Sequence, residues 1–316
     1  MRVAVDVTPL LGRVTGVGQS VRGLLGALPG AAPDVSVVEW ELTRRALPVP
    51  PSVLVRLWAR ADRPSGERWL PGADVVHGTN FVVPPSRRPS TITVHDCWCQ
   101  RSPGACTPVV AAATATVHRA VRRGAWVHVS TEWGADEARE VYGAERVRVV
   151  PFGVPEVAEA GPPPVDGPYV LALGGGGTRK RTDVLRAAMS AFPDLQVVVT
   201  GEPPTGWVED ATRAALLRGA TVLAYPSVYE GFGFPVLEAM SVGVPVVASA
   251  VGGVPEVAGD AAVLVPPDDV DALRAGLQRA LDERGSLVAL GRARAAEFTW
   301  ERHAAGMAEL WREAAA

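Results

Sequence analysis

The strongest constraint on the fold is a regular alternation of short apolar runs with stretches of helical length. The runs rich in β-branched residues are Val3–Val7, Val35–Leu42, Val75–His77, Thr91–Val94, Trp126–Ser130, Val147–Val150, Tyr169–Leu173, Leu195–Thr200, Thr221–Tyr225, Pro245–Ala248 and Ala262–Val265. The helical candidates are Gln19–Leu28, Pro108–Arg123, Gly134–Tyr142, Thr182–Phe192, Val208–Leu217, Pro235–Val242, Asp271–Leu281 and Trp300–Glu313. Apolar strands that alternate with helices indicate parallel sheets covered on both faces. The sequence therefore predicts an α/β protein.

One segment divides this pattern into two series. Pro155–Pro168 holds five prolines and two glycines in fourteen residues, a composition typical of a stiffened linker. We predict a doubly wound domain over residues 1–154, a linker over 155–168, a second doubly wound domain over 169–299 and a C-terminal helix over 300–316 that packs back on the first domain. Ligands of such sheets bind beyond the carboxyl ends of the strands, so we expect the site between the two domains.

Composition excludes several classes of protein. The chain is 47% apolar, which excludes a disordered chain, and no run approaches the roughly 20 apolar residues of a bilayer span. With a net charge of −3 and no basic run interleaved with aromatics, nucleic-acid binding is not expected. The first half is mildly basic, which allows at most peripheral membrane contact. Three clustered cysteines imply no disulfide framework. We expect a cytoplasmic protein with reduced thiols.

Two glycine-rich segments are candidates for binding an anion. Gly16 and Gly18 follow the first predicted strand, where glycines let a backbone approach a ligand closely, although a pair of turn glycines fits equally well. Four glycines at 174–177 precede Arg179, Lys180 and Arg181, and Lys180 is the only lysine of the chain. Glycines followed by cations suit a phosphate, although this is not a P-loop sequence. The alternative is a flexible surface loop with solvated arginines.

The most informative segment is Tyr225–Met240. Pro235 suits the first turn of a helix, so the amides of Phe232–Phe234 are expected at its positive end. Glu230 and Glu238 lie before and inside that helix, where acids are commonly caps. Eight helical residues span about 12 Å, against the roughly 5 Å between the carboxyls of a retaining hydrolase. The spacing favours two separate binding tasks.

Other polar residues have simpler alternatives. His95 ends a predicted strand, where it could donate a hydrogen bond to a ligand, although a histidine there is usually structural. Asp269-Val270-Asp271 matches a metal-binding D-x-D pattern but precedes an amphipathic helix, which favours helix caps. His95 with Cys97, Cys99 and Cys106 lacks the paired spacing of a zinc site. We therefore predict no metal.

At this point a family resemblance becomes visible. The segment from Tyr225 through Pro267 resembles the retaining family 4 glycosyltransferases of GT-B fold. It carries their E-x7-E signature as Glu230 and Glu238, followed by the segments 243–249 and 252–256. The resemblance extends to residues 15–18, 94–96, 146–154 and 179–180, in the family's order across both predicted domains.

The resemblance implies two Rossmann-like domains facing across a cleft, with a nucleotide-diphosphate sugar as co-substrate and no other cofactor. The donor is expected to be a GDP- or UDP-sugar bound mainly to the second domain. The acceptor, on the first domain, is an unidentified glycan, lipid-linked or small molecule. The implied donor-binding and catalytic residues are Lys180 at the diphosphate, Glu230 and His95 at the sugar, Glu238 at the ribose, Phe232, Gly233 and Phe234 through their amides, and Gly16, Gly18, Gly175 and Arg179 around the phosphates.

Two questions stay open at this stage. Many members have an arginine where this chain has Gly175, so either Arg179 or Arg181 supplies the second phosphate cation. No carboxylate stands out as a covalent nucleophile, so front-face retention without a metal is favoured. The alternatives are a non-catalytic nucleotide-sugar-binding protein on a degenerate GT-B scaffold and, less favoured, a UDP-sugar epimerase.

Overall fold

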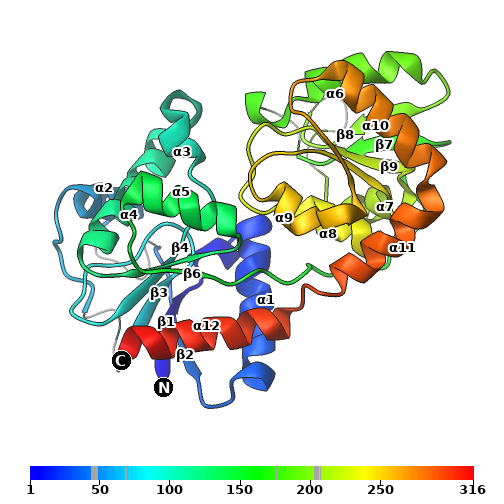
Figure 1. The fold of residues 1–316 in the computed structure, drawn as a ribbon. Coiled ribbons are helices and arrows are strands. Elements are labelled where there is room, and N and C mark those ends of the chain that lie inside the picture. The colour runs from blue at the N-terminus through cyan, green and yellow to red at the C-terminus, as the bar shows by residue number, and fades with distance from the viewer. Residues whose placement is uncertain (44–48, 68–69, 71, 175–176, 203–205, 207) are drawn as a thin grey trace. The chain divides into compact units, whose positions relative to one another are not determined.

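The computed structural model describes residues 1–43, 49–67, 70, 72–174, 177–202, 206 and 208–316 (Figure 1). The chain divides into two compact units, each described here by itself. The first unit comprises Met1–Gly153 with Thr299–Ala316, and the second comprises Val154–Phe298. Each unit is a parallel sheet flanked by helices, which confirms the predicted α/β fold class.

A six-stranded parallel sheet in the order β2-β1-β3-β4-β5-β6 forms the centre of the first unit. Its strands are β1 (Arg2–Asp6), β2 (Ser36–Trp40), β3 (Val75–Gly78), β4 (Ser90–Thr93), β5 (Trp126–Val129) and β6 (Val147–Val149). In β1, Val3 lies opposite Val37 of β2 and Val75 of β3. Each strand coincides with one of the predicted apolar runs to within two residues at either end.

Helices cover both faces of this sheet (Figure 1). They are α1 (Gly16–Ala31), α2 (Pro51–Arg60), α3 (Trp98–Arg101), α4 (Pro108–Arg122), α5 (Glu132–Tyr142) and α12 (Trp300–Ala315). Val3 and Val5 pack with α1 and α12, whereas Ala4 packs in the core that contains α4 and α5. Alternation of side chains along a strand explains this division, and both faces need apolar residues because both are covered.

The C-terminal helix α12 packs against α1 within the first unit. Ala304, Met307 and Trp311 are fully buried and form an apolar stripe at helical spacing. A Cβ on Gly23 of α1 would lie 2.2 Å from the ring of Trp300, so this glycine admits the close approach of the two helices. The end of the chain thus completes the core of the unit that contains its beginning.

The second unit holds a five-stranded parallel sheet in the order β11-β10-β9-β7-β8. Its strands are β7 (Tyr169–Ala172), β8 (Gln196–Val199), β9 (Val222–Tyr225), β10 (Val246–Ser249) and β11 (Val263–Val265). Its helices are α6 (Thr182–Ala188), α7 (Asp210–Gly219), α8 (Phe234–Ser241), α9 (Val254–Ala258), α10 (Val270–Asp282) and α11 (Arg284–Ala295). The chain places β8 on one side of β7 and then crosses to β9 on the other. Ligands of such sheets bind at this reversal, beyond the carboxyl ends of the strands.

Local sequence signals define several helix ends. The Thr131 hydroxyl accepts a hydrogen bond from the Gly134 amide at 3.1 Å, and α5 then ends at Gly143 with a positive φ of 65°. Asp269 accepts from the Ala272 amide at 2.9 Å at the start of α10. This contact confirms that Asp269 is a helix cap. Among the described residues, no helix combines the length and apolar character needed to cross a bilayer.

The cysteine prediction was wrong. Cys99 and Cys106 form a disulfide, with their Cα atoms 5.7 Å apart. The short helix α3 and a turn at Pro103–Ala105 fold the six intervening residues back, which brings the two cysteines into bonding range. Cys97 is a buried thiol whose pKa burial raises to about 12, so it stays protonated. Within the described parts of the chain, no three His, Cys, Asp or Glu side chains are grouped as metal ligands.

Candidate functional site

The candidate site of the second unit is built on the loops that follow β7, β9 and β10. After β7, the backbone turns at Gly174 and Gly177, both with positive φ, and enters a short 3-10 helix at Thr178–Lys180. Gly175, a predicted donor-binding residue, lies outside the described residues, as does its neighbour at 176. After β9, the loop carries Glu230 and leads into α8. Because β7 and β9 are neighbours, the two loops meet at the reversal point of the sheet.

Lys180 and Glu230 form an ion pair at this point. Lys180 Nζ lies 2.7 Å from Glu230 Oε1 and 3.2 Å from the Tyr225 hydroxyl, and 4.7 Å from the centre of the Tyr225 ring. The Lys180 side chain is 18% exposed and that of Glu230 is 9% exposed, so little solvent screens the pair. The lone lysine is therefore held at the carboxyl edge of the sheet against an acid and an aromatic ring.

The charges around Glu230 explain its ionisation. Burial acts to raise its pKa, but the positive charges of Lys180 and Arg179 outweigh burial and hold the pKa below its ordinary value. Burial beside this carboxylate raises the pKa of the Tyr225 hydroxyl well above its ordinary value. At neutral pH, Glu230 is thus a carboxylate and Tyr225 a neutral hydroxyl.

Backbone contacts fix the three loops to one another. The Val228 amide donates to the Arg179 carbonyl at 2.9 Å, which joins the loop after β9 to the one after β7. The Gly253 amide donates to the Glu230 carbonyl at 2.9 Å, which joins the loop after β10. A Cβ on Gly252 would lie 2.0 Å from that carbonyl oxygen, and its φ is +57°. Only glycine fits there, so the backbone holds Glu230 in place.

The segment after Glu230 forms a helix start. Gly233 has φ +101° and precedes α8, which begins at Phe234 with Pro235 in its first turn, as predicted. Phe232 is buried, and its ring lies 5.2 Å from that of Phe234 and 5.9 Å from that of Phe298. The N-terminal end of α8 carries partial positive charge and favours an anion.

Glu238 has a different partner from Glu230. Its two carboxylate oxygens accept from the two terminal nitrogens of Arg213, on α7, at 2.9 and 2.6 Å. The Glu238 side chain is 6% exposed and that of Arg213 is 29% exposed. The structure thus pairs each acid of the E-x7-E signature with its own cation. Arg213 carried no signal in the sequence, because nothing near it in the chain is unusual.

The two arginines that flank Lys180 differ in their surroundings. The Arg181 guanidinium contacts the carboxylates of Asp183, at 3.1 Å, and Asp268. These contacts turn it towards acids on the surface of the unit. The charge of Arg179 instead acts on Glu230 and Tyr225. Arg179 is therefore the arginine that shares its electrostatic environment with Lys180.

In the first unit, the structure corrects the prediction of a glycine loop at residues 15–19. Gly16 and Gly18 lie in the first turn of α1, not in a loop before it. Gly18 is buried, and a Cβ there would lie 2.7 Å from the Pro9 carbonyl oxygen and 2.8 Å from Val14 Cγ1. Packing of the helix start against the preceding turn requires this glycine. Gly16 is exposed.

His95 lies beyond the carboxyl end of β4. Its Nε2 donates to the Thr79 carbonyl oxygen at 2.9 Å, and its ring stacks on Phe152 at a centroid distance of 5.6 Å. Burial lowers its pKa below the ordinary value, so the imidazole is neutral at pH 7. The carbonyl contact fixes the ring orientation.

Four of the five histidines form one group in the first unit, here called the histidine cluster: the buried His77, His128 and His303 and the half-buried His95. The Thr93 hydroxyl lies 2.9 Å from His128 Nδ1 and 3.4 Å from His77 Nε2. His303 Nδ1 donates to the Pro151 carbonyl at 3.0 Å. Burial lowers the pKa of His77 to about 3 and that of His303 to about 4, and also lowers those of His95 and His128.

The first unit is expected to lose stability as the pH falls from 7 to 5. In the unfolded chain, histidines take up protons near pH 6.5, whereas in the folded chain the histidine cluster stays neutral. The unfolded state therefore binds more protons, and the free energy of unfolding falls between pH 6.5 and about 3 to 4. Burial raises the pKa of Asp6 to about 6, so protonation of this carboxyl stabilises the folded state below pH 6. This is one group, whereas four histidines act in the opposite direction.

Tryptophan fluorescence during urea unfolding measures this effect, because eight of the nine tryptophans belong to the first unit. All five histidines lie in the first unit, so the second unit is the internal control. Hydrogen exchange of its backbone amides is compared at pH 7 and pH 5 after correction for the intrinsic exchange rate. Equal urea midpoints at the two pH values would contradict the prediction.

Comparison with known proteins matches part of the chain to a family. A family model described as Glycosyl transferases group 1 matches residues 153–283. O-antigen chain mannosyltransferase B of Escherichia coli is 48% identical over 99 residues, which are 30% of this chain and 26% of that protein. A phosphatidyl-myo-inositol mannosyltransferase of Mycolicibacterium smegmatis is 32% identical over 194 residues, 51% of this chain and 50% of that protein. Residues 153–283 are therefore similar to the group 1 glycosyltransferases.

Solved structures agree with this glycosyltransferase assignment at the level of the fold. Sucrose-phosphate synthase from Thermosynechococcus elongatus superposes with a TM-score of 0.75 at 21% identity, covering 99% of this chain and 98% of that one. Anabaena HepE, solved in complex with UDP and glucose, gives a TM-score of 0.70 at 15% identity over 99% and 100% of the two chains. These neighbours confirm the GT-B fold. The matched regions span about a quarter to a half of the length of the curated relatives.

Proposed function

We propose that this glycosyltransferase moves a sugar from a nucleotide-diphosphate sugar to an acceptor, with retention of the anomeric configuration and without a metal ion. One observation carries the proposal: the only lysine of the chain lies 2.7 Å from Glu230, between the carboxyl ends of two adjacent strands. A compact ammonium beside the positive end of α8 suits a diphosphate.

The proposed roles follow from the charges of the reaction. Cleavage of the sugar–phosphate bond builds negative charge on the departing diphosphate. Lys180, Arg179 and the N-terminal end of α8 would stabilise that charge in place. Glu230, held by its backbone contacts, would accept hydrogen bonds from the sugar hydroxyls, and Glu238, oriented by Arg213, would accept from the ribose. Because no carboxylate is assigned as a nucleophile, we favour front-face displacement over a covalent sugar intermediate.

His95 is proposed to contact the donor sugar from the first unit. Its Nε2 proton is engaged by the Thr79 carbonyl, so its Nδ1 is the nitrogen that can accept from a sugar hydroxyl. A neutral imidazole is required for this role, and burial favours that form. Gly16, at the exposed start of α1, is retained as a proposed contact to the donor phosphates through its backbone.

For the sugar, the nucleotide and the acceptor, we propose classes of compound. The relatives from Escherichia coli and Mycolicibacterium smegmatis are mannosyltransferases by name, so mannose is the first sugar to test, as a GDP- or UDP-sugar. The acceptor is a glycan, a lipid-linked sugar or a small molecule. A non-catalytic nucleotide-sugar-binding protein is the second candidate, because each signature acid is paired with a cation of the chain itself.

A thermal-shift panel of nucleotide diphosphates and their sugars tests the proposal, because a ligand that binds only the folded chain raises its Tm. One nucleotide and its sugar are expected to give a clear rise that EDTA does not change. Slow release of the nucleotide diphosphate from that sugar would then separate an enzyme from a binding protein. No response to any member of the panel would refute the proposed function.

The two arginines beside Lys180 are expected to differ in the same assay. Arg179→Ala should weaken nucleotide-diphosphate binding by about tenfold, which corresponds to one charge-assisted hydrogen bond. Arg181→Ala removes the same charge two residues further on and should change binding by less than about threefold, because its guanidinium is paired with Asp183 and Asp268. Titration by calorimetry measures both, and an equal loss in the two variants would overturn the assignment.

A further inference from the structure

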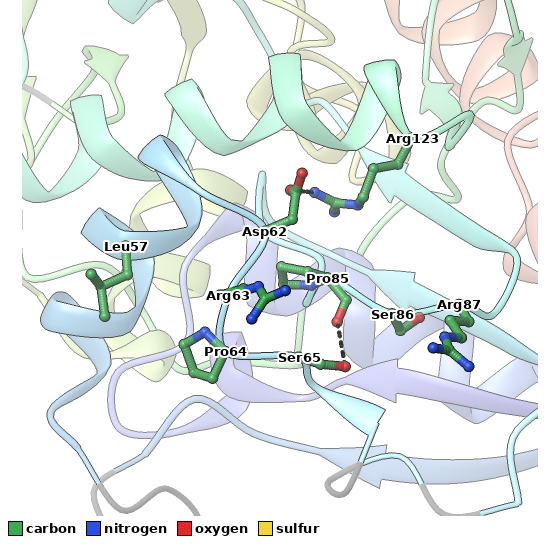
Figure 2. A pocket seen from close by; sticks show the side chains of 9 residues that line it. All are labelled: Leu57, Asp62, Arg63, Pro64, Ser65, Pro85, Ser86, Arg87 and Arg123. Carbon is green, nitrogen blue, oxygen red and sulfur yellow. Dashed lines mark hydrogen bonds and ion pairs between the residues drawn. The ribbon is translucent and has the colours of Figure 1, made fainter.

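A hollow of about 770 Å³ lies in the first unit, away from His95 (Figure 2). Its lining residues are Leu57, Asp62, Arg63, Pro64, Ser65, Pro85, Ser86, Arg87 and Arg123. Arg87 comes shortly before β4 and Arg123 shortly before β5, whereas His95 follows β4. The hollow is therefore at the amino ends of the strands, at the opposite edge of the sheet from His95. Substrates of this fold bind at the carboxyl ends, so the hollow is a separate feature.

The hollow has an excess of positive charge. Asp62 is shared by two guanidinium groups, at 2.5 Å from Arg123 and 3.1 Å from Arg119. Glu67 accepts from the Arg87 amide at 2.5 Å and pairs with Arg88 at 3.3 Å. Together with Arg63 and Arg87, five arginines that the structure describes stand here against two carboxylates, which leaves an excess of three positive charges among these residues.

Two of these arginines are available to a ligand. The side chains of Arg63 and Arg87 are exposed at the rim and form no ion pair with any residue the structure describes. Figure 2 shows the Arg63 guanidinium beside Pro64 and Pro85 and the Arg87 guanidinium beside Ser86, both apart from the Asp62–Arg123 pair. Guanidinium groups bind phosphate oxygens through paired hydrogen bonds, so unpaired arginines beside a hollow favour a phosphate.

The apolar walls of the hollow favour a ligand that carries an organic group as well as a phosphate. Leu57, Pro64 and Pro85 supply apolar surface, and the volume falls within the roughly 300 to 1,000 Å³ of small-molecule sites. We propose that this hollow binds a phosphate-bearing ligand through Arg63 and Arg87, with the ligand body against the apolar wall. The phosphate could belong to a soluble phosphorylated molecule or to a lipid headgroup, since Leu57 and Val53 of α2 are 42% and 41% exposed. The inference does not depend on the proposed transfer reaction.

Pyrophosphate binding by the full-length chain tests the site. The titration uses the Lys180→Ala background, which removes the contribution expected from the second unit. In that background, R63A/R87A is expected to weaken pyrophosphate binding by about tenfold or more, because two charge-assisted contacts are lost. R22A/R146A is the matched control: it also removes two exposed arginines from the first unit, away from the hollow, and should change binding by less than about twofold. Circular dichroism checks that each variant is folded.

Vesicles distinguish the two sources of phosphate. If the ligand is a lipid, vesicles of phosphatidic acid in phosphatidylcholine bind the chain, pyrophosphate competes, and R63A/R87A abolishes binding. If the ligand is soluble, pyrophosphate binds and the vesicles do not. The proposal is overturned if neither probe binds the Lys180→Ala chain, or if R63A/R87A and R22A/R146A weaken binding equally. The charge reversal Arg87→Glu is the second variant, to be used if R63A/R87A does not fold.

Discussion

Lys180→Ala is expected to lower kcat/KM for the nucleotide-sugar donor by about 10²- to 10³-fold, the usual cost of removing one preorganised donor from developing negative charge. The variant removes the only ammonium from the junction of β7 and β9. It also leaves Glu230, 9% exposed, without the cation 2.7 Å away. The diphosphate would then meet an unbalanced carboxylate, so binding and the chemical step should both suffer. Initial rates of nucleotide-diphosphate release, with the donor found by thermal shift, measure the effect.

Two further variants interpret that result. Arg186→Ala removes a cation from α6, the helix that follows Lys180 in the second unit. Its side chain is half exposed and paired with Glu202, so the rate should stay within about twofold. Lys180→Arg keeps the charge but replaces a compact ammonium with a planar fork, and should recover only part of the rate. A Lys180→Ala enzyme that keeps more than a fifth of the wild-type kcat/KM would contradict the proposed role.

The strands were predictable because their pattern is local. A parallel strand covered on both faces must be apolar along its whole length, and all eleven such runs are strands. The helices α2, α3, α9 and α11 were not predicted. In α2, for example, Pro50 and Pro51 indicate a loop, yet a proline at the first position also favours a helix start. Only packing against α4, which is distant in the sequence, decides between the two.

The candidate site was predictable as a set of residues but not as a set of contacts. Lys180, Glu230 and Glu238 stood out by their rarity and by the resemblance, whereas their partners Tyr225 and Arg213 did not. Gly18 was expected in a loop, whereas it lies in the first turn of α1. A Cβ there would lie 2.7 Å from the Pro9 carbonyl oxygen, a contact that its spacing from Gly16 did not reveal. The sequence carries no direct record of such three-dimensional proximity.

Arg213→Ala is expected to destabilise the second unit by about 3 kcal/mol, the lower part of the range for a buried ion pair that loses one partner. Glu238 is 6% exposed and would lose its counterion. The lower part of the range applies because the Arg213 side chain is 29% exposed, so water can replace some of its contacts. Hydrogen exchange of α8 and β9 amides in increasing urea measures the second unit separately from the first.

Charge burial can be separated from lost packing with one double variant. Glu238→Gln in the Arg213→Ala background replaces the orphaned carboxylate with a neutral amide of the same shape, and should restore part of the lost stability. Arg186→Ala is the control, because its half-exposed pair with Glu202 should contribute less than about 1 kcal/mol. If Arg213→Ala is no less stable than Arg186→Ala, the pair does not orient Glu238. Its proposed contact with the ribose would then need another support.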